Sequence, residues 1–79
     1  MTNMEKYVEA FVKTLGVEAA KAPELKYLEI DEWDSVGHMS LVAEIESTFD
    51  IMMDTDDILD FESFAKGKEI LQEKYHIQF

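Results

Sequence analysis

The 79-residue chain has no cysteine, no glycine-rich loop and no cluster of metal-ligating side chains. Without cysteine it can form no disulfide bond, and without a zinc pattern it has no metal to hold a small fold together. No apolar run approaches the roughly 20 residues that cross a bilayer. Packing of apolar residues is therefore the expected source of stability, and the length predicts a single domain over residues 1–79.

The start of the chain also lacks the features of a targeting segment. Its first residues, Met-Thr-Asn-Met-Glu-Lys, include neither the apolar core of a secretory signal nor the arginine-rich character of a transit peptide. The absence of cysteine agrees with a reducing compartment. We expect a soluble, cytoplasmic protein that does not insert into a membrane.

Acidic residues are concentrated in the middle of the chain. Between Glu24 and Glu62 there are 13 acidic residues and one basic residue, Lys26, whereas the other 40 residues carry five acidic and six basic ones. Such a field repels nucleic acid and anionic membranes and attracts partners that present lysine and arginine. A solvated surface that only aids solubility is the alternative. Repulsion among these acids also predicts a fold that gains stability when the pH falls from neutral or salt is added.

The first helix is predicted over Asn3–Leu15, where apolar residues recur with helical spacing. Thr2 and Glu5 have the spacing of a capping box before this helix, and Gly16 follows its last apolar residue as a stop signal.

A structured loop is predicted for residues 17–33. Pro23 ends any helical turn begun at Glu18, and no alternating run of β-branched residues is long enough for a sheet. A loop of this length inside a small domain needs apolar anchors. The predicted anchors are Leu25, Leu28 and Ile30.

The second helix carries the one distinctive polar site. Asp34 is a favourable N-cap, which places Ser35 at the first helical position with its hydroxyl facing solvent. The predicted buried stripe consists of Val36, Met39, Val42 flanked by Leu41 or Ala43, Ile45 and Phe49. The residues predicted to face water are Ser40, Glu44, Ser47 and Thr48.

Two further helices complete the predicted fold. A short helix covers Asp56 to about Asp60 with Thr55 as its cap, and Ser63 caps a fourth helix. Gly67 in the fourth helix permits a close helix crossing. The apolar stripe of the fourth helix is Phe64, Ile70, Leu71 and Tyr75. The fold class is therefore all-α, a four-helix bundle with a long first loop and a short third helix.

Other interpretations of these residues are less specific. Ser35 is only a helix cap if it, rather than Asp34, occupies the N-cap position. His38 lies one turn after Ser35, but no third residue or oxyanion loop accompanies it, so we predict no catalytic residue. The acidic run at residues 54–57 lacks the glycine of a calcium loop, and we predict no metal site there; a weak cation site on the acidic surface is the alternative. Met39, Met52 and Met53 are expected to fill the core.

The segment from Trp33 to Leu71 resembles the acyl carrier protein family. The resemblance lies in Asp34-Ser35-Val36 at the start of a helix and in the following Leu-Val-Ala-Glu-Ile-Glu-Ser-Thr-Phe-Asp at residues 41–50. It implies a four-helix bundle of acyl-carrier type in which Ser35 bears a 4′-phosphopantetheine arm. A separate phosphopantetheinyl synthase transfers the arm from coenzyme A, and acyl intermediates are then held as thioesters. The chain would itself catalyse nothing.

The same resemblance implies a surface for partner enzymes. The residues assigned to it are Asp34, Val36, Glu46, Asp56 and Asp57, and the implied partners are the synthase and acyl-transferring or acyl-modifying enzymes with basic patches. The carrier is expected to act as a monomer.

Departures from the family pattern leave the cargo open. Val36 replaces the usual leucine, and Gly37-His38 replaces an acidic or polar pair. Tryptophan before Asp-Ser and Gly-His after it are similar to stand-alone carriers of specialised pathways more than to the carrier of fatty-acid synthesis. The alternatives are an aminoacyl or peptidyl carrier and an unmodified small acidic interaction domain.

Overall fold

Four α-helices and one 3₁₀ turn make up the regular structure of the chain, which a computed structural model describes over residues 1–79. The elements in chain order are α1 (Asn3–Leu15), the 3₁₀ turn η1 (Ala22–Glu24), α2 (Ser35–Phe49), α3 (Thr55–Asp60) and α4 (Phe64–Lys74). No β-strand is present, and an isolated bridge joins Lys26 to Ser63. The predicted all-α class, with a long first loop and a short third helix, is confirmed.

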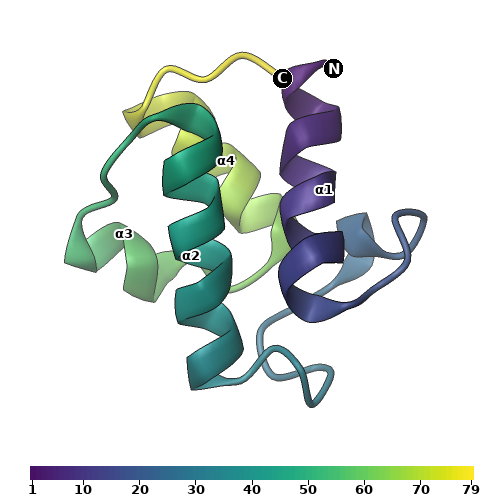
Figure 1. The fold of residues 1–79 in the computed structure, drawn as a ribbon. Helices are drawn as coiled ribbons and strands as arrows, with labels where there is room; N and C mark the ends of the chain where they lie inside the picture. The colour runs from purple at the N-terminus through teal and green to yellow at the C-terminus, as the bar shows by residue number, and fades with distance from the viewer.

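The helices enclose one core. Figure 1 shows α1 and α2 side by side and running in opposite directions, with α3 beside α2 and α4 crossing behind them. The C-terminal segment returns over the top of the molecule to the N-terminus, where the Asn3 side-chain amide donates a hydrogen bond of 2.9 Å to the carbonyl of Gln78. Ser35 therefore lies at the opposite end of the bundle from the two termini.

The ends of α1 follow from local sequence. The Thr2 hydroxyl accepts from the amide of Glu5 at 3.1 Å, and the Glu5 carboxylate accepts from the amide of Thr2 at 2.9 Å. Gly16 ends the helix with a φ of +69°, a left-handed conformation that glycine adopts without steric cost. The predicted capping box and stop signal are both confirmed.

The loop before α2 is fixed by backbone hydrogen bonds to the segment before α4. The amide of Tyr27 donates to the carbonyl of Glu62 at 2.8 Å, and the carbonyl of Leu25 accepts from Phe64 at 3.0 Å. Leu25 is buried, as predicted, but Leu28 is not an anchor. Its φ is +67° and its side chain is 65% exposed, because the chain reverses direction there.

Pro23 does not end a turn but forms part of one. It lies within the first two positions of η1, where its fixed φ fits and its missing N–H is not needed. A turn is present at residues 18–22, where the carbonyl of Glu18 accepts from the amides of Lys21 at 3.0 Å and Ala22 at 3.2 Å, but it continues into η1 instead of ending at Pro23.

Aromatic side chains fill the centre of the core. Trp33 is fully buried, and its ring meets that of Phe11 edge-on with 5.4 Å between centroids. The ring of Tyr7 lies 4.5 Å from that of Phe64, and the Tyr7 hydroxyl donates to the Phe64 carbonyl at 2.7 Å. These contacts join α1 to the loop and to α4, so the aromatic cluster holds three parts of the chain together.

The core face of α2 differs from the prediction. Val36 is 75% exposed and Met39 is 53% exposed. The buried residues are His38, Leu41, Val42 and Ile45. Apolar residues lie on both faces of this helix, so spacing alone did not decide which face is covered. A histidine occupies the core face because both of its ring nitrogens find hydrogen-bond partners.

Three other side chains and the start of α3 also differ from the predictions. Met52 is 86% exposed rather than in the core, whereas Met53 is buried as predicted. Glu44 and Thr48 are half-buried and hydrogen-bonded to each other, with 3.3 Å between their oxygens. Helix α3 begins one residue earlier than predicted, with Asp54 as its N-cap.

Gly67 is a buried residue of α4 that faces aromatic side chains of the core. A Cβ atom at this position would overlap Cζ of Phe61 and the hydroxyl oxygen of Tyr7. Gly67 therefore makes room for the aromatic side chains of Phe61 and Tyr7, whereas the backbones of α1 and α4 do not approach closely, so the close helix crossing is not what this glycine provides.

We expect the substitution Gly67→Ala to destabilise the fold by about 1–3 kcal/mol through overpacking. Helix propensity alone predicts the opposite sign, a gain of about 1 kcal/mol. Urea unfolding of the wild type and of the Gly67→Ala variant distinguishes the effect of overpacking from that of helix propensity. The control substitution Ala65→Gly, at an exposed position of α4, measures the effect of helix propensity without a steric clash. A Gly67→Ala variant more stable than the wild type would show that the space beside Phe61 and Tyr7 tolerates a methyl group.

Candidate functional site at the start of helix α2

Ser35 is the first residue of α2, and its side chain is exposed. Asp34 caps the helix: its carboxylate accepts from the amide of Gly37 at 2.8 Å, and its carbonyl accepts from the amide of His38 at 2.7 Å. The predicted cap and the predicted position of the serine are both confirmed. Because Asp34 fills the capping role, the Ser35 hydroxyl is left facing solvent.

The loop is held closely against the first turn of α2. A Cβ atom on Gly37 would overlap the carbonyl oxygen of Glu32, so only glycine fits between this carbonyl and the helix. The amide of Leu28 donates to the carbonyl of Trp33 at 3.0 Å, which closes the loop just before the cap. Burial of the Trp33 side chain then fixes the backbone directly before Asp34. Ser35 is thus an exposed group on a rigidly placed helix end.

Tyr27 reaches Ser35 from the loop. The two hydroxyl oxygens are 3.3 Å apart, and either can be the donor. The tyrosine ring lies against Trp33 and His38, with centroid distances of 6.2 Å and 5.1 Å. Sequence reasoning did not include Tyr27 in the site, and no local signal could have placed it there, because the contact depends on how the loop folds over α2.

His38 is a structural residue that links three elements. The indole N–H of Trp33 donates to Nδ1 of His38 at 2.9 Å, and Nε2 of His38 lies 2.9 Å from the carbonyl oxygen of Ile58 in α3. Since indole can only donate, Nδ1 must accept and Nε2 must carry the proton. Both nitrogens are engaged within the fold. The imidazole is therefore not placed to accept a proton from Ser35.

The acidic residues of α2 are also engaged internally. Glu46 accepts from the amide of Met53 at 2.8 Å and so shapes the turn between α2 and α3. Glu44 pairs with Lys13 of α1 at 3.2 Å. The outward face of α2 consequently presents Val36, Met39, Ser40 and Ala43, with no acidic side chain among them.

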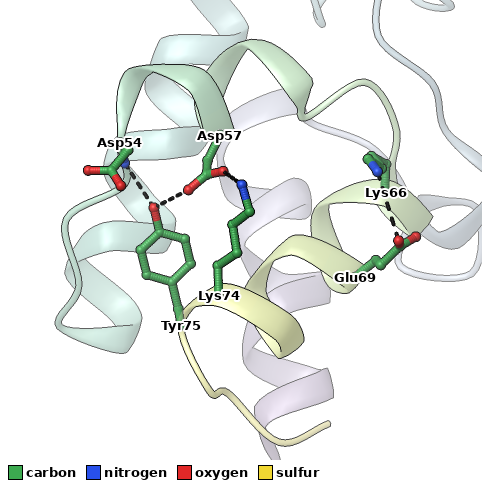
Figure 2. Close-up of polar contacts among 6 residues, drawn as sticks. All are labelled: Asp54, Asp57, Lys66, Glu69, Lys74 and Tyr75. Carbon is green, nitrogen blue, oxygen red and sulfur yellow. Dashed lines mark hydrogen bonds and ion pairs between the residues drawn. The ribbon is translucent and has the colours of Figure 1, made fainter.

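Asp57, which was assigned to the partner surface, is instead covered by α4. Figure 2 shows its carboxylate between Lys74 and Tyr75, which donate to it at 2.6 Å each. The Tyr75 hydroxyl oxygen also accepts from the amide of Asp54 at 2.8 Å. This cluster holds the first turn of α3 to the end of α4. Asp57 is therefore not available to a partner, whereas Asp34, Val36 and Asp56 are exposed.

The ionisation of this cluster is tied to its hydrogen bonds. The bonds from Lys74 and then Tyr75 lower the pKa of Asp57. The pKa of Lys74 is raised mainly by its hydrogen bond to Asp57, and that of Tyr75 is raised by burial and then by the same carboxylate. The charged pair is the favoured form at neutral pH. The stability that this pair contributes is lost as the pH falls, whereas repulsion among the acids predicts a gain in stability as the pH falls.

Other features do not add a second polar site. No three histidine, aspartate or glutamate side chains are grouped to hold a metal ion. An open depression of about 250 Å³ lies on the N-terminal half of α1, and its lining residues are Met1, Met4, Glu5, Val8, Glu9 and Ala19. None of these residues belongs to α2.

Comparison with protein-family models, curated proteins and solved structures finds no match to this chain. No helix combines the length and the apolar character needed to cross a bilayer. Function must therefore be argued from the chemistry of the site.

We expect the substitution Asp57→Asn to lower the melting temperature at pH 7 by roughly 5 °C, because it removes charge-assisted hydrogen bonds with a net value of about 1 kcal/mol. A lowered pKa in the folded state contributes stability above the unfolded value of about 3.9, and this stability is lost as the pH falls through the folded value. The difference in melting temperature between the wild type and the Asp57→Asn variant should therefore shrink below about pH 4. Thermal unfolding from pH 7 to pH 3 measures it.

A matched control is Glu69→Gln. It removes the exposed Lys66–Glu69 ion pair, whose atoms are 3.8 Å apart (Figure 2), and should change the melting temperature little. Equal effects of the two substitutions would contradict a specific role for Asp57.

Proposed function

We propose that this chain is a carrier protein of the acyl-carrier type, in which the Ser35 hydroxyl receives a 4′-phosphopantetheine group from coenzyme A. The main support for this proposal is that an exposed serine occupies the first position of α2, where Asp34 already caps the helix. The resemblance of Trp33–Leu71 to the acyl carrier family and the order of the helices support the proposal. Its cargo is an acyl group held as a thioester.

The residues around Ser35 are compatible with this group. The first N–H groups of a helix have no intrahelical partner, and the positive end of the helix dipole favours a phosphodiester there. The side chains of Leu28 and Val36 are exposed, so the arm has open space and apolar surface beside it. When bound, the arm supplies the terminal thiol that a chain without cysteine lacks.

In the modification step this chain supplies only the nucleophile. Ser35 Oγ forms a bond to phosphorus, the bond between that phosphorus and the adenosine-phosphate part of coenzyme A breaks, and the hydroxyl proton leaves. His38 cannot take this proton, because both its nitrogens are engaged with Trp33 and Ile58. The proposal therefore assigns the base and the magnesium ion to the phosphopantetheinyl synthase.

The partner surface combines an apolar centre with acidic edges. Val36 and Met39 provide exposed apolar side chains on α2, next to Ser35. Exposed acids lie in the loop before α2 and in α3, and they are Glu29, Asp31, Glu32, Asp34, Asp56 and Asp60. This arrangement suits the synthase and acyl-transferring enzymes whose basic residues surround an apolar patch. The protein would act in the cytoplasm as a monomer.

Two alternatives remain distinct proposals. An aminoacyl or peptidyl carrier uses the same Ser35 chemistry and differs only in cargo. A small acidic interaction domain uses the same acids but leaves Ser35 unmodified. The exposed acids favour a basic partner in either case.

Incubation with coenzyme A, magnesium and a phosphopantetheinyl synthase should add the mass of one phosphopantetheine group to the wild-type protein. The Ser35→Ala variant should keep its fold, because the side chain is exposed, yet gain no mass. Ser40→Ala, at another exposed position of α2, is the matched control and should be modified normally. Intact-mass spectrometry with circular dichroism gives the result. An unmodified wild type would favour the interaction domain, and a modified Ser35→Ala variant would refute the assignment.

Charge on α3 should govern how fast the synthase engages the carrier. We expect Asp56→Lys to lower kcat/KM for modification by roughly three- to tenfold at low salt, with the difference shrinking as salt screens it over a Debye length of about 8–10 Å. Glu69→Lys, on α4, makes the same charge change and should have a smaller effect. Equal effects of the two variants, or salt-independent kinetics, would indicate that the acids serve only solubility.

A further inference from the structure

We infer that Tyr27 is a positioning residue for the group carried on Ser35. Its hydroxyl makes a weak contact with the Ser35 hydroxyl before modification and donates a hydrogen bond to the phosphodiester afterwards. This inference rests on the proposed function, because the phosphodiester exists only if Ser35 is modified. The observation that carries it is the 3.3 Å contact between the two hydroxyl oxygens.

The Tyr27 hydroxyl is held in place by buried parts of the fold. Its backbone amide donates to the carbonyl of Glu62, in the segment before α4, at 2.8 Å. Its ring lies at 60° to the imidazole of His38 and at 80° to the indole of Trp33. Those two rings are themselves joined by a hydrogen bond of 2.9 Å. The position of the hydroxyl is therefore fixed from three directions, although it lies at the surface.

Modification changes what the hydroxyl can do. At 3.3 Å the contact with Ser35 is longer than the optimum of about 2.7–2.8 Å, so the bond is weak in the unmodified protein. Once Ser35 Oγ is an ester oxygen it has no proton, and Tyr27 becomes the donor. The phosphate oxygens that extend beyond Oγ carry negative charge, and hydrogen bonds to an ionised acceptor are shorter and stronger.

The neighbouring side chains explain why a neutral donor matters at this position. Asp34 precedes Ser35, and the nearby loop contributes Glu29, Asp31 and Glu32. Carboxylates cannot donate to a phosphodiester and repel its charge. No lysine is hydrogen-bonded to or ion-paired with Ser35, Tyr27 or Asp34. Tyr27 is the side chain in contact with Ser35 that can fix the orientation of the group at this site.

The substitution Tyr27→Phe removes one oxygen and tests the inference. In the modified variant we expect the ³¹P resonance of the phosphodiester to move from its wild-type position toward that of a phosphopantetheinylated unfolded peptide. We also expect kcat/KM for modification by the synthase to fall by about three- to tenfold, as for the loss of one hydrogen bond. In the wild type, the Tyr27 hydroxyl proton should exchange with water more slowly after modification than before it.

Tyr7→Phe is the matched control, because it removes the same atom from a tyrosine that donates to Phe64 in the core. It should lower the melting temperature but leave the ³¹P resonance unchanged. A wild-type protein that accepts no arm would contradict the proposed function itself. A modified Tyr27→Phe variant with the wild-type resonance and rate would overturn the inference while leaving the function intact. If that variant does not fold, unchanged hydroxyl exchange in the wild type overturns it equally.

Discussion

Burial of Trp33 is the interaction on which the arrangement around Ser35 depends. The indole lies in the core against Phe11 of α1, and its N–H is satisfied by His38. The next residue, Asp34, is already the cap of α2. One buried side chain therefore ends the loop, starts the helix and sets the direction in which Ser35 faces. An exposed hydroxyl gains a fixed position without making core contacts of its own.

Polar contacts and the packing of Ile58 against the core together hold α3 in place. This helix has six residues, and its Leu59 side chain is 71% exposed. The imidazole of His38 holds it to α2 through the Ile58 carbonyl, and Asp57 holds it to the end of α4. Because hydrogen bonds are directional, these two attachments fix the orientation of α3, while Ile58 packs against the core. The acids of this chain thus divide into a structural group and an exposed group.

That division bears directly on how a partner would recognise the protein. Glu44, Glu46 and Asp57 satisfy groups within the fold, so they contribute little to an approaching basic surface. The exposed acids lie at the edges, and the outward face of α2 is apolar and neutral near Val36 and Met39. In the proposed carrier function, such a surface would use charge to orient a partner and apolar contact to bind it. In the proposed function the Ser35 hydroxyl would depend on the partner enzyme for a base, because both ring nitrogens of His38 are hydrogen-bonded within the fold.

Local sequence determined the features whose causes are local. The capping box of Thr2 and Glu5, the stop at Gly16 and the cap at Asp34 each depend on residues within one turn, so the limits of α1 and the start of α2 could be predicted. The position of Ser35 followed from the same reasoning. The carrier function remains a proposal that rests on resemblance and on this position.

Only the tertiary structure decided which groups meet across the chain. The covered face of α2 depended on whether His38 finds partners, and these come from Trp33 and from Ile58, 20 residues away. Asp57 is buried because Lys74 and Tyr75 fold over it, which no charge count reveals. The contact between Tyr27 and Ser35 also depends on the tertiary structure. It could not be predicted, because a loop without helical or strand periodicity carries no local signal of where its side chains point.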